Sequence, residues 1–133
     1  MSLDEALGVW AEAAQDMASA GLAQAMGAHY NCVDLCNQVS EKALQSVYLL
    51  THDGRAMYDH NLRALGELVD APPEILADLA ALTPYHPGAF LETISPDDAD
   101  DAVGPVAADD MLLRARRVLR WARQFVVGSS WQQ

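Results

Sequence analysis

The sequence predicts an all-α fold, and two observations lead to that prediction. Ala and Leu supply 23 and 17 of the 133 residues, whereas Val, Ile and Thr together supply only 15, a balance that favours helices over strands. Apolar residues recur at helical spacing along most of the chain, and no segment alternates with a period of two between hairpin turns. We therefore expect residues 1–133 to form a single domain, an up-and-down bundle of four main helices plus one short helix.

The first helix is expected to begin at Ser2, which opens a capping-box pattern completed by Glu5, and to end at Gly21. Its predicted apolar stripe is Leu3, Leu7, Trp10, Ala14 and Met17. The second helix is expected over residues 28–51, before a break at Asp53-Gly54. Its predicted stripe is Val33, Cys36, Val39, Ala43, Val47 and Leu50.

A third helix is expected over residues 61–69, and the short helix over residues 73–82, where Pro73 and Glu74 suit a first turn. Residues 83–107 contain prolines, glycines and clustered aspartates, so they predict a long loop that is either mobile or functional. The last helix is expected over residues 108–127. Its predicted core stripe is Leu112, Ala115, Leu119, Ala122 and Val126.

Charge and composition exclude several classes of protein. The net charge is −11, from 8 basic and 19 acidic residues, which argues against binding nucleic acid over the whole surface. No apolar run approaches about 18 residues, so no membrane span is predicted. The acidic start of the chain differs from the basic start of a signal peptide, and two cysteines are too few for a disulfide scaffold. We therefore expect a cytoplasmic protein with reduced thiols.

One segment carries a family resemblance. Residues Tyr30–Leu44 read Tyr-Asn-Cys-Val-Asp-Leu-Cys-Asn-Gln-Val-Ser-Glu-Lys-Ala-Leu, which resembles the second helix of HEPN (higher eukaryote and prokaryote nucleotide-binding) domains. His60-Asn61-Leu62 with Leu65 is similar to the opening of the family's third helix, and residues 108–125 to its Ala- and Leu-rich last helix. The features similar to its first helix are Trp10, Ala14, Asp16, Met17 and Ala20.

The resemblance implies an all-α domain, commonly a homodimer, often encoded with a minimal nucleotidyltransferase in a toxin–antitoxin-type pair. Some members are metal-independent ribonucleases with an Arg, four to six residues and then a His or polar residue near the start of the last helix. Residues 103–110 contain neither Arg nor His, and Pro84-Tyr85-His86-Pro87 replaces the frequent Arg-Tyr-Pro. These departures favour an accessory role over catalysis.

Arg55 and His60 form a second Arg/His pair with four residues between them. A His can take the proton of a ribose 2′-hydroxyl, and an Arg can stabilise charge developing on phosphorus. The pair lies between the second and third helices, away from the family's catalytic position, and His60 also fits the opening of the third helix. It is therefore the alternative interpretation only.

Two further groups are candidates for ligand binding. Glu41 and Lys42 lie next to each other on the second helix and could meet a phosphate at a cleft, or form ordinary pairs between helices. Five of the eight basic residues fall between positions 114 and 123, and Arg116, Arg120 and Arg123 share one face of the last helix. Arg suits phosphate through its planar fork, although the same residues could be a solvated face paired with nearby carboxylates.

Cys32 and Cys36 could share a metal with His29, but a structural zinc site needs four ligands and this set has three. We expect two buried core cysteines instead, no metal and no cofactor. Tyr85 and His86 could stack on a base, or simply cover the end of the bundle.

Three functions follow from these features. The first is a HEPN-like accessory protein that binds nucleotide or RNA and acts with a nucleotidyltransferase partner, using Glu41, Lys42 and the three arginines. The second is a toxin-like ribonuclease that uses Arg55 and His60. The third is a dimeric adaptor without a ligand, whose arginines dock an acidic protein.

Overall fold

The computed structural model describes residues 2–52 and 61–131. Those residues form six α-helices, two short 3₁₀ turns and no strand, which confirms the predicted all-α class. The helices are α1 (Ser2–Ala25), α2 (His29–Thr51), α3 (Leu62–Leu68), α4 (Pro73–Leu82), α5 (Pro87–Phe90) and α6 (Ala99–Trp131). The 3₁₀ turns are η1 (Thr83–Tyr85) and η2 (Pro96–Asp98).

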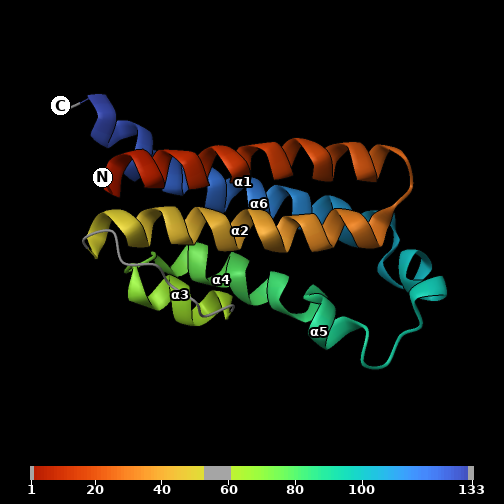
Figure 1. The fold of residues 1–133 in the computed structure, drawn as a ribbon. Coiled ribbons are helices and arrows are strands. Elements are labelled where there is room, and N and C mark those ends of the chain that lie inside the picture. The colour runs from red at the N-terminus through yellow and green to blue at the C-terminus, as the bar shows by residue number, and fades with distance from the viewer. Residues whose placement is uncertain (1, 53–60, 132–133) are drawn as a thin grey trace.

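Helix α2 lies at the centre of the bundle. The long helices α1 and α6 pack along one side of it, and the shorter α3 and α4 cover the other side (Figure 1). Successive main helices α1, α2, α4 and α6 run in alternating directions, which is the predicted up-and-down arrangement. The shortest of the five predicted helices is α3, and not the Pro73–Leu82 helix that was expected to be so.

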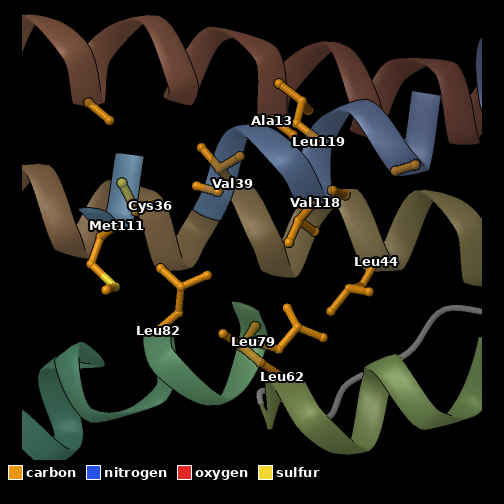
Figure 2. Close-up of a cluster of buried hydrophobic side chains, with 14 of the residues drawn as sticks. Ala13, Cys36, Val39, Leu44, Leu62, Leu79, Leu82, Met111, Val118 and Leu119 are labelled. Carbon is orange, nitrogen blue, oxygen red and sulfur yellow. The ribbon is translucent and has the colours of Figure 1, made fainter. Parts of the chain in front are cut away.

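Most of the core is one cluster that draws side chains from every major helix, and a smaller cluster consists of Ala6, Leu49 and Val126. Figure 2 shows part of the larger cluster, with Val39 and Leu44 of α2 lying between side chains of α1 and α6 and those of α3 and α4. Five of the six predicted stripe positions of α2 are fully buried, and Leu50 is partly buried. The predicted stripe of α6 is likewise buried at Ala115, Leu119, Ala122 and Val126.

The prediction for α1 was wrong in two respects. The helix continues through Gly21 to Ala25, and the turn at its end uses Gly27, whose φ of 79° is favourable for glycine. The residues that face the bundle are small, because α1 packs closely on α2. The buried positions are Ala6, Ala13, Ala20 and Ala23, while the larger predicted residues lie beside them and are only partly buried. Hydropathy alone selects large residues and overlooks buried alanines.

The segment predicted as a loop from residue 83 to residue 107 is mostly ordered into short helical elements. It contains η1, α5 and η2, and α6 already begins at Ala99. Short caps build these turns, because Ser95 accepts a hydrogen bond from the amide of Asp97 and the ring of His86 accepts one from Gly88. The expected loop was therefore wrong, since each turn is too short to show a helical period.

A backbone break at Gly104 divides α6. Gly104 has φ 74° and ψ 164°, a conformation almost restricted to glycine, and Pro105 then begins the longer part of the helix. Gln24 of α1 stabilises this corner by donating hydrogen bonds to the carbonyl oxygen of Pro105 and to Asp109, each at 2.9 Å. The long part of α6 thus begins at Pro105, three residues before the predicted start at 108, and α6 as a whole begins at Ala99.

Asp100, an acidic residue near this corner, caps the N-terminus of α2. The N-cap residue of α2, Ala28, has no side chain that can accept a hydrogen bond. The carboxylate of Asp100 accepts one instead from the amide of Tyr30 at 2.9 Å, which satisfies a free donor and places negative charge at the positive end of the helix.

We predict that Asp100→Ala lowers the free energy of unfolding by about 1 kcal/mol, the usual value of an N-cap. Asp101→Ala is the matched control, because Asp101 is exposed and its replacement by Ala removes the same charge. Urea unfolding followed by circular dichroism measures both variants. Equal stability of the two would show that the Asp100 contact contributes nothing.

Candidate functional site

The arginines of α6 divide into two groups with different roles. Arg117 donates to both carboxylate oxygens of Asp78 on α4, from Nε at 3.0 Å and from Nη2 at 2.6 Å. Arg114 donates to the same carboxylate at 3.1 Å and to Asp110 at 3.0 Å. Because the residue Asp78 is only 1% exposed, these two arginines join α4 to α6 by pairing with a buried carboxylate.

The pairing of Asp78 follows from its burial. A carboxylate that leaves water is stable only when other groups replace its hydration, and here two guanidinium groups do so. The hydrogen bond with Asp78 raises the pKa of the Arg117 guanidinium, so the positive partner stays charged. Sequence analysis missed Asp78, because it lies on an apolar helix 36 residues before Arg114.

The second group is the predicted set of Arg116, Arg120 and Arg123, which we call the arginine face. All three residues are exposed, and none forms an ion pair with any residue in the described ranges. Arg120 and Arg123 line an open groove of about 580 Å³ near the end of α6. The other described residues of its lining are Gln124, Val127 and Gly128. The arrangement places three cationic forks, with their donors in water, along one helix.

Lys42 pairs with carboxylates of α1. Its Nζ atom lies 2.8 Å from Asp16 and 3.9 Å from Glu12, both on α1. Glu41 accepts a hydrogen bond from Gln45 at 3.3 Å, one turn along α2. Lys42 thus pairs across the interface between α1 and α2, and its charge is already balanced by carboxylates.

Arg55 and His60 lie outside the described residues.

The two cysteines lie in the core, as expected. Cys32 and Cys36 are fully buried and are not joined by a disulfide. The hydrogen bond with Cys32, together with burial, raises the pKa of the Cys36 thiol, which therefore stays protonated. The ring of His29 pairs with Gln24 at 2.8 Å, and in the described part of the chain no three His, Cys, Asp or Glu side chains are placed to hold a metal ion.

The class that this geometry defines is a small α-helical bundle with a cationic face on its last helix. A comparison with solved structures finds a similar fold in the crystal structure of an archaeal HEPN homologue. The TM-score is 0.76 and the identity 21%, over 91% of this chain and 97% of the other. This chain therefore has the fold of a HEPN protein, which confirms the fold implied by the Tyr30–Leu44 resemblance.

No family model matches the chain. No curated protein matches it either. Within the described residues, no helix is long and apolar enough to cross a bilayer.

We predict that Asp78→Ala lowers the free energy of unfolding by about 1–3 kcal/mol, because charge-assisted hydrogen bonds between α4 and α6 are lost. Replacing Arg114 and Arg117 together by Ala costs more, about 3–5 kcal/mol, because it leaves the buried carboxylate without a partner. Urea denaturation curves give both values.

Arg63→Ala is the control for this pair of variants. Its partner is Glu67 at 3.2 Å, but both side chains are more than half exposed, so the expected loss is at most about 0.5 kcal/mol. A loss for Asp78→Ala as small as that for Arg63→Ala would contradict the structural role of Asp78.

We also predict that neither thiol reacts with iodoacetamide in the folded protein, and that raising the pH to about 9 does not change this. The thiolate is the reactive form. Burial excludes the reagent from both thiols, and the raised pKa of Cys36 adds to the protection of that thiol. The hydrogen bond with Cys36 lowers the pKa of Cys32, so Cys32 is protected by burial alone. In urea, both cysteines become alkylated, as mass spectrometry can show. Rapid alkylation of the native protein would mean that Cys32 or Cys36 is accessible.

Proposed function

We propose that this chain acts as a single HEPN-like domain that binds nucleotide or RNA and works as an accessory subunit. The observation that carries the proposal is the arginine face. In a protein of net charge −11, carboxylates are abundant, yet Arg116, Arg120 and Arg123 have none as an ion-pair partner among the described residues.

The chemistry of these side chains suits phosphate. Each guanidinium offers donors in a fork that matches two phosphate oxygens, and weak hydration makes it easier to desolvate than an ammonium group. Positions 116, 120 and 123 follow one another by about one turn, so successive side chains lie roughly 5–6 Å apart along the helix. That spacing is close to the distance between phosphates of an extended single strand, or it lets two arginines hold one polyphosphate.

The acidic remainder of the surface supports a confined site. Negative charge elsewhere repels nucleic acid, so a polyanion that binds is directed to the arginine face. Glu41 and Lys42 remain candidate ligand contacts in this proposal, although Asp16 and Glu12 already pair with Lys42.

We further propose that the protein acts as a homodimer with a nucleotidyltransferase subunit, in a toxin–antitoxin-type pair. The support is the HEPN resemblance of Tyr30–Leu44 together with the HEPN fold. Exposed apolar side chains are compatible with an interface, the most exposed being Leu22, Met26 and Val106.

The test is binding of a short fluorescent single-stranded RNA, and of ATP, to the wild type and to the triple variant Arg116→Gln, Arg120→Gln, Arg123→Gln. We expect the triple variant to bind the RNA at least tenfold more weakly. The slope of log affinity against log salt should fall by about 2, since each phosphate contact in a single strand contributes about 0.7. Fluorescence anisotropy over a range of salt concentrations measures both quantities.

Two single variants control for net charge. Arg120→Gln and Arg63→Gln each remove one positive charge, but Arg63 lies on α3 and pairs with Glu67. Only Arg120→Gln should weaken binding clearly. No binding of either probe, or equal binding by the triple variant, would sink the proposal. If the triple variant lost only its binding to a co-expressed acidic protein, the adaptor function would replace the proposed nucleotide- or RNA-binding function.

A further inference from the structure

A second, smaller pocket lies between α2, α3 and the α4–α5 connection, and it differs in character from the arginine groove. Its volume is about 190 Å³. Its described lining consists of Asn37, Asn61, Leu62, Thr83, His86 and Ala89.

One residue of the lining, Asn37 on α2, has a buried polar atom that lacks a partner. Asn37 is 4% exposed, and its side-chain nitrogen donates to the carbonyl oxygens of Val33 at 3.2 Å and Leu82 at 3.0 Å. Both hydrogens of the amide are therefore used, and two carbonyl acceptors fix which end of the amide is the nitrogen. The oxygen, Oδ1, is buried without a hydrogen bond to any described residue. An unsatisfied acceptor of this kind is costly and needs an explanation.

His86 supplies a hydrogen-bond donor, where Asn37 supplies an acceptor. Its Nδ1 atom accepts a hydrogen bond from the amide of Gly88 at 3.2 Å, so the neutral ring carries its hydrogen on Nε2 and offers a donor. Thr83 uses its hydroxyl hydrogen on the carbonyl oxygen of Leu79 at 2.8 Å, which leaves the hydroxyl oxygen as an acceptor. The lining thus combines an acceptor on α2 with a donor on the α4–α5 connection.

The remaining lining defines which ligands are excluded. No Lys, Arg, Asp or Glu lines the pocket in the described part of the chain, and the oxygen of Asn37 repels an anion. The described lining therefore offers no cationic group to a phosphate. Leu62 and Ala89 give apolar walls, and the volume is below the roughly 300–1,000 Å³ of pockets that hold a whole drug-sized molecule. The pocket suits one small uncharged ring with an N–H donor beside an acceptor.

We infer that this pocket binds a nucleobase with an exocyclic amino group, such as adenine or cytosine, whose amino group donates to Asn37 Oδ1 and whose ring nitrogen accepts from His86. The choice of a nucleobase over another small amide rests on the proposed nucleotide- or RNA-binding function. The pocket itself does not involve the arginine face, so the two sites can be tested separately.

The experiment uses nucleosides, because they have no phosphate. ¹⁵N-labelled protein is titrated with adenosine, cytidine and N6,N6-dimethyladenosine, while the side-chain amide of Asn37 and the ring of His86 are followed by NMR. We expect adenosine and cytidine to shift both signals. Dimethylation removes the donor and leaves the oxygen unpaired, so the dimethylated nucleoside should bind about tenfold more weakly.

Ala89→Phe tests the location. Ala89 is exposed and lines the pocket, so the larger ring fills the space without disturbing the core, and adenosine binding should be lost. Ala18→Phe is the matched control, because Ala18 is an exposed alanine on α1. Circular dichroism verifies that both variants are folded. A short oligoadenylate tests whether the bound base belongs to RNA or to a free nucleoside.

Loss of binding in Ala89→Phe but not in Ala18→Phe supports the pocket, for the nucleoside, the oligoadenylate or both. No binding by any of these ligands, equal binding of the dimethylated nucleoside, or unchanged binding in Ala89→Phe overturns it and leaves an ordered water as the partner of Asn37. The triple arginine variant distinguishes the two proposals. The triple variant should still bind adenosine. If it does, and the wild type binds no polyanion, the base pocket is supported and the binding role of the arginine face is contradicted.

Discussion

The enclosure of α2 by four other helices is the constraint on which the rest of the structure depends. A helix with neighbours on both sides cannot leave polar groups to water, so each polar side chain on its buried faces needs a partner within the protein. Ser40 and Ser46 meet this need locally by donating to the carbonyl oxygens of Cys36 and Ala43. The first turn of the helix receives its cap from Asp100. Asn37 meets the need only in part, since its oxygen is left over.

The basic side chains also divide into those that pair within the fold and those that do not. The protein is strongly acidic, yet two of its arginines are required inside the fold, where Asp78 would otherwise be a buried charge without a partner. Lys42 pairs with acids on α1. The arginine face leaves a small positive surface on one helix of a protein whose net charge is −11. Such a surface favours ligands of high local charge density over long polymers bound along their whole length.

Most helices could be predicted from the sequence, because their signals are local. The apolar period of α2, the prolines before α4 and the cap residue Asn61 before α3 each identify an element within a few residues. The errors share a physical origin in contacts between distant residues. Gly21 lies inside α1 because the helix is supported by packing on α2. The α4–α6 connection is ordered in part by contacts with α2, such as the stacking of Phe90 on Tyr30.

The candidate site shows the same limit. Clustering identified the arginines, but only the structure separates Arg117, which pairs with Asp78, from Arg116, which has no ion-pair partner among the described residues. His86 could be noticed because it stands among prolines in a connection. Asn37 could not, because a polar residue within a helix carries no signal of whether its amide is satisfied. That depends on Leu82, which is 45 residues away.

The break at Gly104 has a consequence for how the end of the chain is assembled. In an unbroken α-helix, successive side chains are about 100° apart around the axis. A rotation of the first turn therefore rotates every later side chain with it. Because Gly104 interrupts α6, the turn that carries Asp100 can be oriented to suit the N-terminus of α2, while the long part that carries the arginines is oriented independently by its own packing. Insertions or deletions in the connection before α6 can therefore be absorbed at this joint, and the direction in which the last helix presents its outer side chains stays the same.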